Sequence, residues 1–121
     1  MTLVLLLEDN PDMLAMLSQV LEWGGYDVLK GYGGQQGVDI LHSTVQLPDI
    51  ILSDLSMPDM DGLEFLARVR ENSAWASIPV VIMSAHSSAN EQQTVLEHGA
   101  NDFLVKPFSL ADFQSVLDKW I

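Results

Sequence analysis

The stretch DIILSDLSMPDMDG, residues 49–62, decides the fold of this chain. It holds a short apolar run, Ile50-Ile51-Leu52, which is typical of a strand buried on both faces of a sheet. Within two residues the run ends on Asp54, and a turn-rich segment with two more acids and Gly62 follows. A charged group at the end of a buried strand is costly, so this acid points to a function.

Apolar runs and segments with helical spacing alternate along the whole chain. Strands are predicted over residues 3–7, 26–30, 50–53, 80–84 and 103–105. Helices are predicted over residues 11–23, 34–43, 62–72, 90–98 and 110–120. Strict alternation of buried strands with helices predicts an α/β fold, a doubly wound five-stranded parallel sheet with helices on both faces.

The bulk composition narrows the class of protein. The 121 residues fit one domain, and 48% of them are hydrophobic, which is enough for a core. A net charge of −12 disfavours nucleic-acid binding, because phosphate contacts need clustered Lys and Arg. The chain has no cysteine, no signal peptide in MTLVLLLEDN and no apolar run long enough to cross a bilayer. We therefore expect a single cytoplasmic domain over residues 1–121, with no output domain and no membrane partner.

Polar side chains follow several of the predicted strands, at the point where each strand ends. Glu8 and Asp9 follow the first strand, Asp54 follows the third, Ser84 ends the fourth and Lys106 follows the fifth. The carboxyl ends of parallel strands meet at one edge, where open α/β sheets bind their ligands. The sequence therefore predicts that three acids, one hydroxyl and one lysine gather at this edge.

Each member of this group has a chemical use. Three carboxylates held together are costly unless a cation joins them, and oxygen ligands without His or Cys suit Mg²⁺. A carboxylate such as Asp54 can act as a nucleophile toward phosphorus and form an aspartyl phosphate. That transfer needs charge neutralisation by a metal and by Lys106, and the Ser84 hydroxyl can donate a hydrogen bond to a phosphoryl oxygen.

In this order, these residues resemble the receiver domain of two-component response regulators over essentially the whole chain. The resemblance implies a flavodoxin-like sheet with strand order 2-1-3-4-5. The residues that carry it are Glu8-Asp9, Asp54, Pro58, Gly62, Ser84-Ala85 and Lys106-Pro107-Phe108.

The resemblance also implies roles for the residues around the metal and the phosphoryl group. Asp54 would be the phosphoacceptor, taking a phosphoryl group from a histidine of a sensor kinase. Asp9 would ligate Mg²⁺ directly and Glu8 directly or through water, while Asp54 and the backbone carbonyl of Ser56 would complete the protein ligands. Lys106 would pair with the phosphoryl group.

Further implied roles concern the response to phosphorylation. Ser84 would be the switch hydroxyl, and Phe103 would be the switch aromatic, at a position where the family often has Tyr. The bond between Lys106 and Pro107 would be cis. Two further positions, which vary within the family, are Ser56 and His86 in this chain. For these residues, two interpretations remain open. Ser56 and His86 would flank the attacking water and tune the lifetime of the phosphorylated state, or His86 is only an exposed loop residue.

The implied partners are a sensor histidine kinase or a phosphotransfer protein, and a downstream protein or output domain that binds residues 90–121. Trp120 lies on the last helix, on the face that the family uses for partners and dimers, so homodimerisation is a further expectation. We expect a signalling domain that assists its own phosphorylation and dephosphorylation, not a separate enzyme.

Other functions fit the sequence less well. A scaffold that works without phosphorylation predicts the loss of an acid, the hydroxyl or the lysine, and none is lost. An aspartyl-nucleophile phosphatase usually has a second acid where Ser56 stands, and a flavin phosphate would be repelled by the acidic loop 8–11. An EF-hand aligned on Gly62 would need ligands at Met57 and Arg68.

Overall fold

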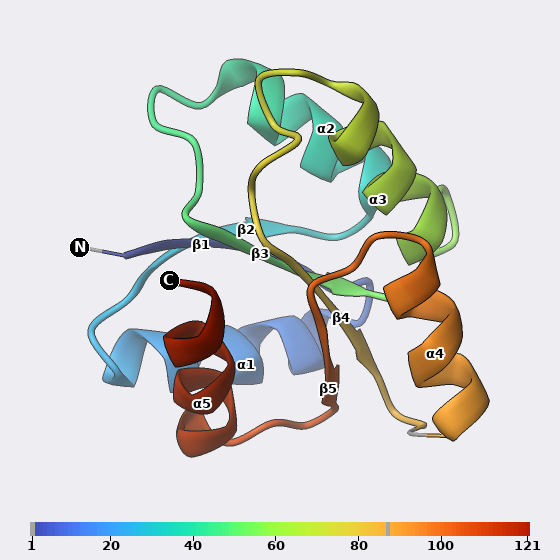
Figure 1. The fold of residues 1–121 in the computed structure, drawn as a ribbon. Coiled ribbons are helices and arrows are strands. Elements are labelled where there is room, and N and C mark those ends of the chain that lie inside the picture. Colours follow the sequence, from blue (N-terminus) through green and yellow to red (C-terminus); the bar gives the residue numbers. More distant parts are fainter. Residues whose placement is uncertain (1, 87) are drawn as a thin grey trace.

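The computed structural model describes residues 2–86 and 88–121, and its elements alternate as the sequence predicts (Figure 1). The strands are β1 (Leu3–Leu7), β2 (Asp27–Gly31), β3 (Ile50–Asp54), β4 (Val80–Ser84) and β5 (Asp102–Val105). The helices are α1 (Pro11–Trp23), α2 (Gly34–Ser43), α3 (Gly62–Glu71), α4 (Ala89–Glu97) and α5 (Leu110–Trp120). Within this described part of the chain, no helix has the length and apolar character that a membrane span requires.

The strands form one parallel sheet in the order β2-β1-β3-β4-β5, which confirms the expected flavodoxin-like topology. Helices α2, α3 and α4 cover one face of the sheet, and α1 and α5 cover the other (Figure 1). The order reverses between β1 and β3, so the topological switch point lies where these two neighbouring strands end.

The third strand is one residue longer than the sequence predicts, because it includes Asp54. This residue stands opposite Met83 of β4 in the parallel register, and the backbone N–H of Leu55 donates to the Met83 carbonyl at 2.9 Å. The backbone of Asp54 is therefore held by the sheet itself. The pairing of β3 with β1 ends one residue earlier, at Ser53, so Asp54 stands at the very edge of the sheet.

Other boundaries also differ by one residue, in two cases because of a cap at the end of a helix. Tyr26 was expected in the second strand, but its N–H donates to Leu21 at the end of α1, so β2 begins one residue later. Helix α4 begins at Ala89 instead of residue 90, because the Ser88 side chain caps it by accepting from Glu91 N at 3.1 Å. Strand β5 begins at residue 102, where its register with β4 starts, instead of residue 103.

Candidate functional site

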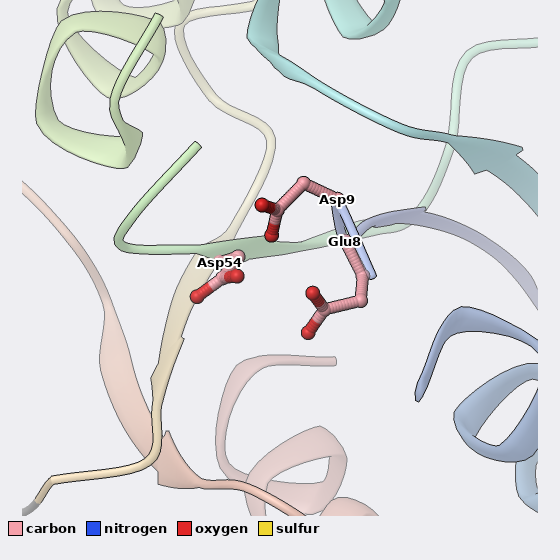
Figure 2. Close-up of side chains that lie close together, drawn as sticks. All are labelled: Glu8, Asp9 and Asp54. Carbon is pink, nitrogen blue, oxygen red and sulfur yellow. The ribbon is translucent and has the colours of Figure 1, made fainter. Parts of the chain in front are cut away.

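The ends of β1 and β3 bring three carboxylates together, and Figure 2 shows them grouped at this point. Glu8, Asp9 and Asp54 each offer a carboxylate oxygen, and these oxygens lie within 4.8 Å of one another. Glu8 is 1% exposed and Asp54 is 4% exposed, whereas Asp9 is open to solvent. The cluster that was predicted from the strand ends is present, and it combines two buried acids with one accessible acid.

Lys106 places a positive charge inside this cluster. Its Nζ donates to Glu8 Oε1 at 2.6 Å and to Asp54 Oδ2 at 3.0 Å. The peptide bond between Lys106 and Pro107 is cis, as the resemblance implies. The sequence indicated that Lys106 belongs at this edge, but its direct bond to Glu8 was not foreseen.

Burial and neighbouring charges have opposite effects on the pKa values of Asp54 and Lys106. The pKa of Asp54 is raised from 3.8 to about 6 overall: burial raises it most, the hydrogen bond from Lys106 lowers it, and the charge of Glu8 raises it. Burial lowers the pKa of Lys106, but its hydrogen bonds to Glu8 and Asp54 outweigh that effect, so the pKa is raised overall. When all three carboxylates are ionised, the single ammonium group leaves the cluster with a net negative charge. This net charge favours the binding of a further cation.

The donor chemistry of the cluster fits Mg²⁺. All its side-chain ligand atoms are carboxylate oxygens, which this hard cation prefers. The two oxygens of Glu8 are already engaged, since Oε1 accepts from Lys106 and Oε2 accepts from the backbone N–H of Asn10 at 3.0 Å. Asp54 likewise accepts from Lys106 at Oδ2, but its Oδ1 has only the long 3.4 Å contact with Ser56 N, and Asp9 is open to solvent. Asp9 and Oδ1 of Asp54 are therefore the most available carboxylate groups for direct contact with a metal.

The remaining predicted residues lie around the same edge of the sheet. Ser84 ends β4 and is buried, and its Oγ accepts from the backbone N–H of His86 at 3.2 Å. His86 itself is exposed, as is Ser56, whose backbone N–H reaches Asp54 Oδ1 at 3.4 Å. Phe103 is partly buried on β5 and packs against the core that α2, α3 and α4 cover.

The loop that follows β3, residues 55–61, returns tightly to the site. At its end, the N–H of Gly62 donates to the Leu55 carbonyl at 2.8 Å, and a Cβ at this position would collide with the Asp54 carbonyl oxygen. Met57 and Met60 of the loop are buried in the core. The requirement for glycine at position 62 thus comes from the close approach of the loop to the Asp54 backbone.

Sequence reasoning missed one residue of this loop, Asp59. No contact is predicted for it from the sequence, but its carboxylate accepts from the backbone N–H groups of Gly34 and Gln35 at 3.3 Å and 3.1 Å. A signal for this contact exists in the sequence, because Gly33 precedes α2 and has no side chain with which to cap the helix.

A doubly wound sheet with acids after β1 and β3 and a lysine after β5 is the arrangement of a receiver domain. The chain matches the model of the response regulator receiver domain over residues 4–118, and it belongs to that family, which serves two-component signalling systems. It is 36% identical to the KDP operon transcriptional regulatory protein KdpE of Escherichia coli over 97% of its length, and it spans 50% of that longer protein.

Solved structures agree with this assignment. The chemotaxis protein CheY4 of Vibrio cholerae is 29% identical, with a TM-score of 0.90 over 100% of this chain and 99% of that one. The receiver domain of the sensor histidine kinase PA1611 from Pseudomonas aeruginosa is 30% identical, with a TM-score of 0.87 over 98% of this chain and 96% of that one. That structure holds a magnesium ion coordinated in its active site cleft.

Proposed function

We propose that this domain accepts a phosphoryl group on Asp54 from a phosphohistidine of a sensor histidine kinase or phosphotransfer protein, in a Mg²⁺-dependent reaction in the cytoplasm. The observation that carries the proposal is the position of Asp54. Its carboxylate is fixed at the end of a central strand, buried to 4% exposure, and bound by Lys106 beside two further acids. An anchored carboxylate with cations on its flanks suits phosphoryl transfer.

The reaction needs no proton from Asp54, because the ionised carboxylate is the nucleophile. A bond forms between a carboxylate oxygen and phosphorus as the N–P bond of the donor breaks, and the electron pair of that bond stays on the imidazole. Lys106 Nζ, which contacts the acceptor carboxylate at 3.0 Å, is positioned to pair with the phosphoryl oxygens. The domain thereby assists its own phosphorylation.

The acids of the cluster would hold the metal. Asp9, Asp54 through its weakly engaged Oδ1, and the carbonyl of Ser56 are the direct ligands in this proposal, and Glu8 acts through water because each of its oxygens accepts a hydrogen bond of 3.0 Å or less. When bound, Mg²⁺ would neutralise charge that develops on the phosphoryl oxygens. The magnesium in the PA1611 receiver domain supports this choice of ion.

Phosphorylation would act on the rest of the domain through Ser84 and Phe103. Ser84 Oγ would leave the N–H of His86 and donate to the phosphoryl group, and Phe103 would repack beside it. The surface of α4, β5 and α5 would then change its affinity for a downstream protein, an output domain or a second copy of the domain. Exposed apolar side chains support a binding role for this surface, namely Leu96, Val105, Trp120 and Ile121.

The intact mass of the protein after incubation with an acyl phosphate and Mg²⁺ tests the central proposal. We expect a gain of one phosphoryl mass that is absent in Asp54→Asn and in the presence of a chelator. A folded sample that binds Mg²⁺ but gains no mass with any donor would contradict the proposal and favour a phosphorylation-independent scaffold.

The same measurement tests the proposed roles of Ser56 and His86 beside the attacking water. His86 is exposed next to Ser84, and Ser56 is exposed next to Asp54, so both can contact a water that approaches the phosphoryl group. We expect the half-life of the phosphorylated state to differ between the wild type and His86→Ala. An unchanged half-life would leave His86 as an exposed loop residue without this role.

A further inference from the structure

Helix α2 receives its N-terminal cap from a distant loop. Its N-cap residue is Gly33, and the extended backbone there, with φ −172° and ψ 175°, is normal for a cap. Glycine has no side chain, however, so Gly33 cannot accept a hydrogen bond from the first turn as other N-cap residues do. Asp59 supplies the acceptors instead, with Oδ1 at 3.3 Å from Gly34 N and Oδ2 at 3.1 Å from Gln35 N. A negative charge at a helix N-terminus is favourable, so this contact is a charge-assisted attachment.

Two glycines allow the loop to approach the helix this closely. A Cβ at Gly33 would lie 2.5 Å from Asp59 Oδ1, and a Cβ at Gly34 would lie 2.8 Å from the Cβ of Met60. Met60 is 5% exposed, and its own N–H donates to Asp59 Oδ1 at 2.9 Å. Side-chain packing, backbone contact and hydrogen bonds therefore join the same short segment to the start of α2.

The attached loop is the one that carries the phosphoacceptor site. It leaves β3 directly after Asp54, passes Ser56, whose N–H reaches the Asp54 carboxylate, and closes where Gly62 bonds to Leu55. Asp59 lies between these two ends. Along the chain, Asp59 is therefore only three residues from Ser56.

We propose that Asp59 is a positioning residue of the phosphoacceptor site: by fastening the loop 55–61 to α2, it holds Ser56 and Asp54 in the arrangement that a divalent cation and a phosphoryl group require. This inference rests on the proposed function. Asp59 acts through the loop and does not touch the reacting atoms. The alternative is that Asp59 only stabilises α2, and the two roles are separable in this chain.

A charge-conserving exchange separates them. In Asp59→Ala combined with Gly33→Asp, the carboxylate moves from the loop to the helix, where an N-cap Asp can accept from the first turn. The backbone at Gly33 suits any residue, and the three atoms nearest to a new Cβ there all belong to the Asp59 side chain that the exchange removes. The exchange variant therefore keeps the helix cap and the net charge but loses the hydrogen bonds that join the loop to the helix.

The experiment compares wild type, Asp59→Ala and the exchange variant, with Asp39→Ala on α2 as a control for the loss of one exposed charge. Urea unfolding measures stability, and the rate of phosphorylation by an acyl phosphate over a range of Mg²⁺ concentrations gives the half-saturating concentration. We expect Asp59→Ala to lower the urea midpoint and to raise the half-saturating Mg²⁺ concentration several-fold. The exchange variant should regain the urea midpoint and keep the raised Mg²⁺ requirement, while Asp39→Ala changes that requirement little.

Amide hydrogen exchange gives a second readout that does not depend on phosphorylation. In the exchange variant we expect faster exchange over residues 56–62 and unchanged exchange over α2. Wild-type Mg²⁺ requirement and wild-type exchange over residues 56–62 in that variant would overturn the role of Asp59. If the wild type itself gains no phosphoryl group, the proposed function fails and this inference fails with it.

Discussion

At Asp54, the position that suits the acid for chemistry also disfavours its charge. The pKa of this carboxyl is raised from 3.8 to about 6, because burial raises it by more than the Lys106 ammonium lowers it. A shift of this size corresponds to about 3 kcal/mol between the charged and the neutral form. Because the pKa is higher in the folded than in the unfolded state, this cost is absent below about pH 4 and fully present above about pH 6.

Asp54→Asn should therefore stabilise the metal-free protein near neutral pH. We expect the free energy of unfolding to rise by up to about 3 kcal/mol at about pH 7.5, because the shifted pKa already includes the favourable effect of Lys106. The gain should shrink as the pH falls through 6, since the wild-type carboxyl then becomes neutral too. Urea unfolding in the presence of a chelator measures this at several pH values. A variant that is less stable at pH 7.5, or a difference that does not vary with pH, would contradict the argument.

The position of a residue could be predicted from the sequence where the backbone fixes it, but side-chain contacts between distant segments could not. Glu8, Asp54 and Lys106 were placed together from sequence because each stands next to a strand end, and parallel strands fix where their ends lie. The bond from Lys106 to Glu8 and the contact of Asp59 with α2 were not predicted. Both join segments far apart in the sequence, and they depend on side-chain directions that residue spacing does not contain.

Elements were predicted best where a local signal marks their ends. Helix α1 begins after the Asn10 cap with Pro11 in its first turn, and the chain leaves it through Gly25, whose φ is 86°. The end of β3 was predicted one residue too early, because an acid such as Asp54 is typical of the start of a loop. Pairing with β4 overrides that local preference, since strand length is set by the neighbouring strand as much as by composition.

Helix α5 offers a direct test of such a local signal. Ser109 and Asp112 form a reciprocal capping box, in which the Ser109 side chain accepts from Asp112 N at 3.1 Å and Asp112 Oδ2 accepts from Ser109 N at 3.1 Å. Ser109→Ala removes one of these acceptors, so we expect the free energy of unfolding to fall by about 1 kcal/mol. Urea unfolding is the measurement.

Ser115→Ala is the matched control for this change. Ser115 is exposed in the middle of the same helix, where alanine is the better helix former. The control should leave stability unchanged or raise it slightly. Equal losses in both variants would mean that the serine-to-alanine change itself, and not the cap, sets the result.

On the scale of the whole molecule, negative charge dominates the surface. The chain has a net charge of −12 and only five basic side chains, of which two are engaged inside the fold. Arg70 donates to the carbonyls of Ile78 and Gly99 and to the Asn101 side chain, while Lys106 occupies the acid cluster. Mutual repulsion among the remaining exposed acids therefore opposes the compact state, and salt should weaken this repulsion.

Salt can stabilise the protein by screening charge repulsion, and Mg²⁺ can also stabilise it by binding the acid cluster. These two effects on stability can be distinguished because only the second depends on Asp9. NaCl should stabilise the metal-free protein through screening alone, whereas MgCl₂ at the same ionic strength should stabilise it further by occupying the cluster. At a concentration about tenfold above the dissociation constant, this specific part amounts to about 1.4 kcal/mol.

Asp9→Asn should remove the stabilisation that is specific to Mg²⁺ and keep the response to NaCl. Asp118→Asn, an exposed acid near the end of α5, should keep both, and urea unfolding in the two salts measures the difference. Equal stabilisation of the wild type by the two salts would mean that the cluster does not bind Mg²⁺ under these conditions.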